Sequence, residues 1–260
     1  MNSIFSFQRF GNLMKKQFAE YYKAYLMGAG VLVGLMTLAC TFIVDATKEP
    51  LGLDSQRDLF NITLMIVGAI FTSASFTDAG EKKQAIYLLT LPATLFEKYL
   101  VRWVISYLVF LVVFIVLYYI VIIPFAGLYH GSGKETGGIV NIVNEHNFEI
   151  AMIYYSLVHS LMFFGAIFFR KIHLIKTAFS IFGILVVLNA INSVMIKQML
   201  GLRSIDIRSN MFATLNIQES DGFHSMNAGP SVELMVNIMW VSITLVLWTA
   251  AYFRLKEKQV

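Results

Sequence analysis

Six long apolar runs, separated by stretches of polar and charged residues, set the pattern of this chain. A membrane-spanning helix needs about 20 predominantly apolar residues to cross a hydrocarbon core about 30 Å thick. Each run approaches or exceeds that length; the second is short and the third is the longest. The pattern predicts six transmembrane helices, at Ala24–Val44, Leu59–Phe76, Tyr99–Leu128, Ile150–Phe169, Leu174–Ile196 and Leu234–Phe253.

Residues 1–23, ahead of the first run, combine aromatic and charged side chains. Apolar residues recur there at helical spacing, so they share one face of a helix while the lysines lie elsewhere. Such a helix can lie in the membrane interface, and a soluble cap over the bundle has the same pattern. We expect an interfacial helix and no cleaved signal peptide. The apolar face comprises Phe7, Phe10, Met14, Phe18 and Tyr21.

Positive charges gather on alternate loops. Of the 20 lysine and arginine residues, 14 lie in residues 1–23, 77–102, 170–176 and 254–260. The loops between these segments hold the other six, together with 11 of the 16 acidic residues. Cytoplasmic loops carry the excess of Lys and Arg, so we expect both termini in the cytoplasm. An even number of spans agrees, because it places both termini on the same side.

The segment between the second and third spans contains two successive helix-start signals. Asp78–Glu81 and Thr94–Glu97 both have the capping-box spacing, in which the third helical residue returns a hydrogen bond to the cap. Pro92 disfavours helix at the residue before it. The sequence therefore predicts a short amphipathic helix to about Leu89, a break, and a second helix that continues directly into the third span.

This loop resembles the first cytoplasmic loop of ABC-2-type exporter permeases, in Gly80, the Leu91–Pro92 pair and Lys98, and the six-span layout is also that of the family. The resemblance implies that residues 77–98 hold a coupling helix that docks on a separate P-loop ATPase subunit, which would bind the ATP and Mg²⁺. It also implies that residues 1–23 form the family's elbow helix. An ordinary surface helix of a membrane protein has the same amphipathic pattern. The implied docking residues are Gly80, Glu81, Lys82, Ala85, Leu88, Leu89, Leu91, Pro92 and Lys98.

The loop between the fifth and sixth spans, residues 197–233, is long for a connection and has mixed polarity. Its apolar residues, among them Met211 and Phe212, favour short helices that dip to the membrane interface on the outer side. This feature resembles the last outer loop of ABC-2 permeases. We expect residues 1–260 to form a single transmembrane domain.

The composition agrees with a membrane protein. Hydrophobic residues make up 57% of the chain, charged residues only 14%, and the mean hydropathy is +0.68. The formal net charge of +4 does not indicate nucleic-acid binding, because the basic residues alternate with membrane spans and form no single patch. The single cysteine, Cys40, lies inside an apolar run and excludes a disulfide within the chain.

No motif in the sequence supports chemistry in this chain. Residues 131–136, GSGKET, fail as a phosphate loop because Leu128 replaces the first glycine and Glu135 follows the lysine where Ser or Thr is needed. The histidines have no metal-ligand spacing, and HExxH is absent. We expect no catalytic residue, metal or cofactor in the chain itself, so an ATP-driven activity needs a partner subunit.

His159 is the one ionisable residue deep inside a predicted span. A polar group at that depth finds a partner or stays neutral, and Ser156 and Ser160 lie nearby on the same helix. Two interpretations stay open: a neutral histidine hydrogen-bonded between packed helices, or a residue of a transport pathway. We place no buried Asp, Glu, Lys or Arg inside a span, which disfavours an ion-coupled carrier.

Other polar and small residues in the spans indicate close helix packing. Asn189, Asn192 and Asn237 can hydrogen-bond across helices, or moderate the polarity of a substrate path between the last two spans. Gly30 and Gly34 form a GxxxG motif in the first span, for packing within the chain or between subunits.

Together these features favour an all-α membrane protein that is the permease subunit of an ABC-2-like exporter. The resemblance implies a homodimer or a pair with a homologous permease, in a bacterial inner membrane. An ion-coupled carrier or channel, and a non-transport scaffold subunit of a larger complex, are the alternatives. The sequence does not identify a substrate.

Overall fold

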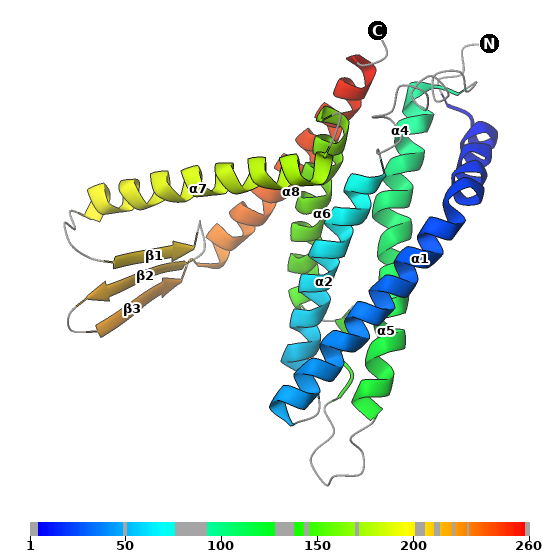
Figure 1. Cartoon of the computed structure of the whole chain (residues 1–260). Coiled ribbons are helices and arrows are strands. Elements are labelled where there is room, and N and C mark those ends of the chain that lie inside the picture. Colours follow the sequence, from blue (N-terminus) through cyan, green and yellow to red (C-terminus); the bar gives the residue numbers. More distant parts are fainter. Residues whose placement is uncertain are drawn as a thin grey trace.

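The computed structural model describes residues 5–48, 51–75, 93–127, 138–142, 146–169, 172–200, 206–210, 214–219, 222–227 and 229–257. Most of these residues are helical, and α4, the π-helical turn η2 and α5 form one continuous helix (Figure 1). The helices are α1 (Phe7–Thr47), α2 (Leu53–Ala74), α4 (Leu95–Val104), η2 (Ile105–Val109), α5 (Phe110–Gly127), α6 (His146–Phe168), α7 (His173–Leu200) and α8 (Pro230–Glu257). The strands are β1 (Asp206–Asn210), β2 (Thr214–Glu219) and β3 (Gly222–Asn227).

Six helices are long and apolar enough to cross a membrane in the described part of the chain, with α4, η2 and α5 counted as one. The six predicted apolar runs fall on these six helices, so the predicted number of spans is confirmed at the level of length and composition. These helices indicate an integral membrane protein.

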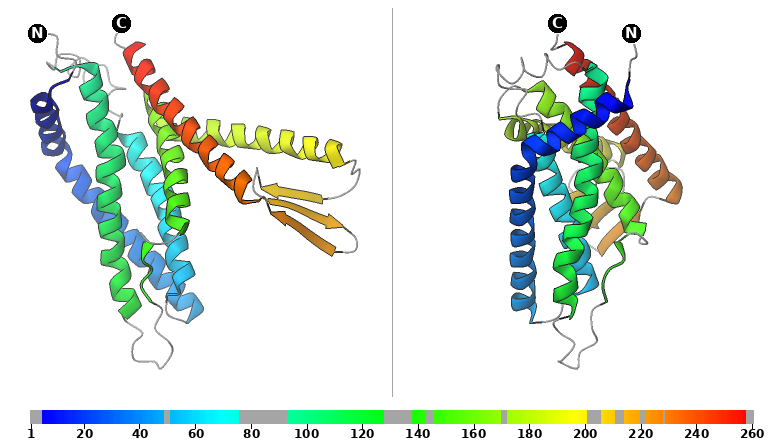
Figure 2. Two further views of the ribbon diagram at one scale, coloured as in Figure 1. Left: turned by 180° about the vertical axis from the view of Figure 1, so that it is seen from behind. Right: turned by 90° about the vertical axis from the view of Figure 1, so that its right-hand side faces the viewer.

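Helices α1, α2, α5 and α6 form an elongated bundle (Figures 1 and 2). Helix α6 is central, because it contacts α2, α7 and α8. The start of α1 and the end of α8 lie at the same end of the bundle (Figure 1). This placement agrees with an even number of crossings.

The predicted N-terminal helix and the first span are joined in one helix, α1, of 41 residues. The right-hand view of Figure 2 shows that its first part runs across the top of the bundle before the helix turns down along it. The change of direction agrees with the expected division into an interfacial helix and a first span. The backbone hydrogen bonds of α1 continue through both parts.

The core of the bundle is aromatic and closely packed. Phe60 of α2 and Phe114 and Tyr118 of α5 are almost completely buried, and the Phe60 ring contacts the rings of the other two. At Gly68 of α2, an added Cβ would lie 2.6 Å from the ring of Tyr155 on α6, so these helices approach more closely than a side chain allows.

The GxxxG motif of α1 makes no such contact. A Cβ added at Gly30 or Gly34 would meet nothing within 4 Å among the described residues. Of the two expectations for this motif, packing within the chain therefore finds no support in the described part.

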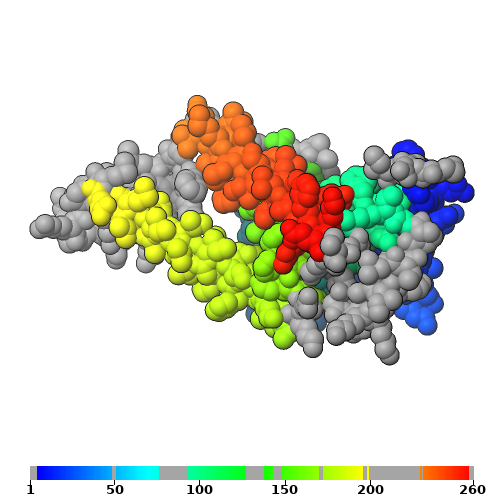
Figure 3. All heavy atoms as spheres, turned by 90° about the horizontal axis from the view of Figure 1, so that it is seen from above, coloured from blue at the N-terminus to red at the C-terminus, as the bar shows by residue number. Residues whose placement is uncertain are grey.

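Helix α7 and the first part of α8 leave the bundle, whereas the later part of α8 packs against α6 (Figure 1). Seen from above, α7 projects away from α1 and α4 (Figure 3). Its apolar side chains are widely exposed, as at Phe179 (75%) and Phe182 (65%). An exposed face this apolar is stable against lipid or another protein surface.

The long loop contains a small sheet, and our expectation of short helices there was wrong. Strands β1, β2 and β3 form a three-stranded antiparallel sheet in that order, with Asp206 opposite Gln218 and Thr214 opposite Asn227. The sequence of residues 214–219, TLNIQE, alternates apolar and polar residues with the period of two that is typical of a strand. The fold is thus helical with one small sheet, and not purely α.

Candidate functional site

The helix that follows the predicted docking loop begins at a complete capping box. The backbone N–H of Glu97 donates to Thr94 Oγ1 (3.3 Å), and the Thr94 N–H donates to Glu97 Oε2 (2.9 Å). The second of the two predicted helix starts is therefore confirmed. Of the implied docking residues only Lys98, half-buried in α4, is described. Gly80, Glu81, Lys82, Ala85, Leu88, Leu89, Leu91 and Pro92 lie outside the described residues.

The other carboxylate oxygen of Glu97 binds the start of α1. Oε1 accepts hydrogen bonds from the Ser6 N–H (2.7 Å) and from Arg9 Nε (3.1 Å), and Arg9 Nη2 lies at 3.0 Å. The Glu97 side chain is completely buried. Charge-assisted hydrogen bonds to a carboxylate, here one whose other oxygen caps a helix, are among the stronger contacts that proteins make. One carboxylate therefore joins α1 to α4; we call this group of Ser6, Arg9, Thr94 and Glu97 the Glu97 clamp.

The start of the long helix carries two buried charged side chains. Glu97 and Arg102 both lie on the long helix and are 0% and 6% exposed. The sequence pattern placed the start of this span at Tyr99, so Glu97 lies before the predicted span and Arg102 in its first turn. The helix tolerates the Glu97 carboxylate because Arg9 and two backbone amides compensate it.

The first turns of α4 also bind α6 and α8. The Tyr99 hydroxyl donates to the backbone carbonyl of Trp248 (2.8 Å). The Tyr99 ring packs edge-to-face against Phe163 of α6 (5.4 Å between centroids) and Tyr252 of α8 (5.5 Å). The start of this helix is thus fixed to α1, α6 and α8.

His159 of α6 lies beside η2, farther along the helix that begins with α4. Through a chain of hydrogen bonds it joins α6 to η2 and to α8. Its side chain is completely buried. Trp248 Nε1 donates to His159 Nδ1 (3.2 Å), and His159 Nε2 lies 2.9 Å from Ser106 Oγ. Because an indole N–H can only donate, Nδ1 carries no proton. His159 Nε2–H then donates to Ser106, whose hydroxyl donates to the Trp103 carbonyl (3.4 Å). This network assigns a neutral imidazole between packed helices.

Ser156 and Ser160 lie near His159 on the same helix, as expected, but their hydroxyls bond to carbonyls of that helix. The Ser156 hydroxyl donates to the Met152 carbonyl (2.6 Å), and the Ser160 hydroxyl donates to the Leu157 carbonyl (2.8 Å). Serine in a helix commonly bonds to a carbonyl of the preceding turn. The partners of His159 come from other helices instead.

The π-helical turn η2 carries the residues that meet α6. Ser106 accepts from His159, and Tyr107 lies 2.6 Å from Ser156 through its hydroxyl and stacks on Tyr155 (5.4 Å). A π turn within an α-helix is rare and is frequent at functional sites. We call Ser106, Tyr107, Tyr155, His159 and Trp248 the His159 cluster.

The predicted path residues are not gathered around His159. Asn189 is exposed on α7, Asn192 is half-buried on the same helix, and Asn237 is half-buried on α8. None of them takes part in the hydrogen bonds described for His159. Among the described residues of the last two spans, Trp248 of α8 hydrogen-bonds this histidine. Sequence reasoning missed Trp248 and Ser106, since nothing in their local patterns marks them as its partners.

The described residues contain no group of three or more His, Cys, Asp and Glu side chains that could hold a metal ion. The GSGKET segment lies outside the described residues. Comparisons with protein-family models, curated proteins and solved structures found no match to this sequence. The similarity to ABC-2 permeases therefore rests on the sequence features alone.

Replacement of His159 by phenylalanine tests the hydrogen-bond chain. Phenylalanine keeps a ring beside Phe163, where the His159 ring is stacked at 5.3 Å, but it leaves the Trp248 N–H without an acceptor. We expect the free energy of unfolding to fall by about 1–3 kcal/mol, measured by unfolding of the full chain in detergent micelles. The matched control is Ser160→Ala, at an equally buried position whose hydroxyl bonds only its own helix. Equal stability of the two variants would contradict the assignment.

Proposed function

We propose that this chain is the membrane-spanning permease subunit of an ABC-2-like exporter, driven by a separate P-loop ATPase subunit. The proposal rests on the anchoring of α4 directly after the predicted docking loop. The capping box begins the helix at once, the Glu97 clamp ties it to α1, and Tyr99 ties it to α8. With no flexible joint between Thr94 and the bundle, a displacement of the loop would move the helix as a unit.

The same helix leads from the loop to the His159 cluster. Thr94 and Ser106 are 12 residues apart on it, which corresponds to about 18 Å at 1.5 Å per residue. At Ser106 the π turn meets α6 and α8 through His159. A π turn often marks a place where a helix adjusts. We propose that displacement of the loop reaches the membrane interior at this turn, and that the substrate path runs near it.

The membrane arrangement that goes with this function has the two termini in the cytoplasm of a bacterial cell and the bundle in its inner membrane. The excess of basic residues in segments 1–23 and 77–102 supports that orientation. The first part of α1, which runs across the end of the bundle, would lie in the interface (Figure 2). A second copy or a homologous permease would complete the path, and the ATPase subunits would bind ATP and Mg²⁺.

A double substitution, Leu88→Asp with Leu89→Asp, tests the docking assignment. The two leucines are the apolar end of the predicted docking helix. Two carboxylates on a face that enters an apolar groove would weaken docking by about 3 kcal/mol or more, which is about 100-fold. We expect loss of the co-purifying ATPase, measured by pull-down of the tagged chain, while membrane insertion is retained.

The matched control places the same two charges at the opposite end of the bundle, in Leu53→Asp with Ile139→Asp. These two apolar side chains are 41% and 49% exposed. The control should retain the ATPase. Retention of the ATPase by the Leu88 and Leu89 variant would refute docking at this helix.

An ion-coupled carrier is the second candidate, because Glu97 and Arg102 are buried in the long helix. Vesicles that contain the chain with and without the ATPase separate the two functions. The exporter requires ATP and the partner. Transport by the chain alone along a proton or sodium gradient would favour the carrier.

A further inference from the structure

Two cationic side chains lie over a pair of aromatic rings where α6 ends, α7 begins and α8 ends. The rings of Phe168, the last residue of α6, and of Phe169 after it have centroids 5.2 Å apart. Arg254 Cζ of α8 lies 5.1 Å from the Phe168 centroid, and Lys176 Nζ of α7 lies 5.9 Å from that of Phe169. We call Phe168, Phe169, Lys176 and Arg254 the basic junction. The ring faces attract both cations and bring them to one place on the surface.

Both charges of the basic junction are accessible to a ligand. Lys176 is exposed. The Arg254 side chain is 41% exposed and pairs with Glu257 (2.6 Å), which is 63% exposed. Such a pair contributes little stability, and a guanidinium has further donors in a geometry that matches a phosphate. Residues 170–176 contain three Lys or Arg and no acid, and residues 254–260 contain three with one acid. The excess of positive charge favours an anion.

The start of α7 adds donors beside Lys176. The first helical bond runs from the Lys176 N–H to the Ile172 carbonyl (3.1 Å), so the amides of residues 173–175 have no acceptor within the helix. Isoleucine at the cap position has no side-chain acceptor to offer them. The His173 side chain is 9% exposed, and its Nε2 is buried without a hydrogen-bond partner among the described residues. A phosphate is the acceptor that such a helix end favours.

Exposed apolar side chains continue from the basic junction along the spans. Ile175 and Phe179 lie one turn apart on α7 and are 66% and 75% exposed, and Phe253, next to Arg254, is 55% exposed. Helices α6, α7 and α8 are each long and apolar enough to cross a membrane. Cations at the ends of such helices lie where lipid head groups meet acyl chains.

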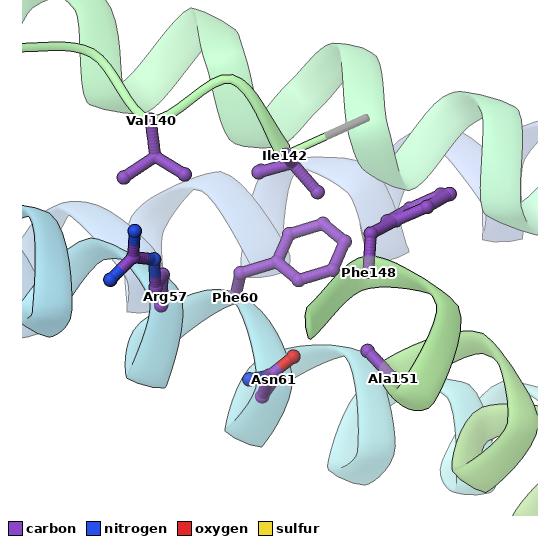
Figure 4. Close-up of a pocket in the computed structure, with 7 residues that line it drawn as sticks. All are labelled: Arg57, Phe60, Asn61, Val140, Ile142, Phe148 and Ala151. Atoms are coloured by element: carbon purple, nitrogen blue, oxygen red, sulfur yellow. The ribbon is translucent and has the colours of Figure 1, made fainter. Parts of the chain in front are cut away.

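A pocket at the opposite end of the bundle has no room for a lipid chain. It lies between α2, α6 and the extended segment 138–142, with Phe60 directed toward Ile142 and Phe148 (Figure 4). Its volume of about 20 Å³ admits a single water molecule, and Phe60 and Val140 are each only 2% exposed. The exposed surface at the basic junction has no such limit of size.

We propose that the basic junction binds one anionic phospholipid. Its phosphate lies between Lys176 and Arg254, at the start of α7, and its acyl chains lie along Ile175 and Phe179. Basic side chains between membrane helices recognise anionic head groups in this way. The bound lipid bridges the start of α7 and the end of α8. This binding is independent of whether the chain transports a substrate.

Native mass spectrometry of the purified full chain tests the site. The chain is stripped of lipid in detergent, and dioleoyl phosphatidylglycerol, dioleoyl phosphatidylcholine or glycerol 3-phosphate is then added in equal amounts. We expect one retained phosphatidylglycerol, weaker binding of phosphatidylcholine and no retention of glycerol 3-phosphate, which has no acyl chains. Lys176→Gln combined with Arg254→Gln should weaken retention of phosphatidylglycerol about 30-fold, since each basic residue near a membrane surface contributes about fivefold.

The matched control is Lys23→Gln combined with Lys256→Gln, which removes the same charge. Lys23 lies over the ring of Tyr22 on α1 (5.9 Å), and Lys256 is exposed two residues beyond Arg254, about 200° around the helix. The control should retain phosphatidylglycerol as the unsubstituted chain does. Unchanged retention in the variant of Lys176 and Arg254, or an equal loss in the control, would overturn the site.

The three ligands test the chemistry of the head group and the chains. Equal binding of phosphatidylglycerol and phosphatidylcholine would overturn the preference for an anionic lipid. Retention of glycerol 3-phosphate as strong as that of phosphatidylglycerol would identify a soluble phosphate ligand and would overturn the lipid assignment.

Discussion

Replacement of Arg9 by methionine is expected to lower the free energy of unfolding by about 2–3 kcal/mol. Methionine keeps the apolar stem but leaves the completely buried Glu97 carboxylate without its cation. The amides of Ser6 and Thr94 still donate to that carboxylate, and the Arg9 side chain is 35% exposed, so the loss is smaller than for a fully buried pair. Unfolding of the full chain in detergent micelles measures it.

A double-mutant cycle separates the ion pair from its surroundings. Glu97→Gln should also lower stability, because both carboxylate oxygens accept backbone N–H bonds and an amide supplies only one oxygen. Arg9→Met combined with Glu97→Gln should be more stable than Arg9→Met alone, since no unpaired charge is then buried. If Arg9→Met changes stability by less than about 0.5 kcal/mol, the Glu97 clamp does not hold α1 to α4.

Replacement of Gln56 by leucine is expected to cost about 2–4 kcal/mol. The side chains are similar in size, but leucine leaves three backbone groups without partners: the carbonyls of Leu51 and Gly138 and the N–H of Val140. The segment 138–142 should separate from α2 and open more often. Hydrogen exchange at the amides of Val140 and Ile142 should therefore accelerate along with the loss of stability.

The matched control is Gln8→Leu, the same substitution at an exposed position of α1. It should change the free energy of unfolding by no more than about 0.5 kcal/mol. Unchanged hydrogen exchange at Val140 in Gln56→Leu would show that the extended segment is held by other contacts.

The features that the sequence predicts correctly are those decided by neighbours along the chain. The six spans follow from runs of apolar residues, and the cap at Thr94 follows from a partner three residues away. The alternation of apolar and polar residues in 214–219 also indicates β2. We expected helices there because of the apolar residues scattered through this loop. The period of two in this short sequence was sufficient to predict a strand.

Contacts between distant residues could not be predicted in this way. Arg9 and Glu97 are 88 residues apart, and His159 finds its partners in Ser106 and Trp248, on two other helices. The π turn at Ser106 has no local signature in its apolar sequence. A capping box predicts a role for Glu97 within its own helix but not its second bond to α1.

The residues of the candidate site show the same difference between local and long-range information. His159 could be singled out because a histidine in an apolar run is conspicuous, and its burial fits the expectation of a hydrogen-bonded neutral side chain. Asn189 and Asn237 looked equivalent in sequence, yet they lie on helices that leave the bundle. Only the three-dimensional arrangement separates these cases. The roles of the docking residues between Gly80 and Pro92 stay predictions.

Purification of the tagged chain from its native membrane in mild detergent, with mass spectrometry of the proteins that accompany it, tests the exporter function most directly. The proposed function predicts a P-loop ATPase in stoichiometric amount. Its reproducible absence, from a preparation in which the chain is intact and folded, would contradict the permease assignment and favour a carrier or a scaffold subunit.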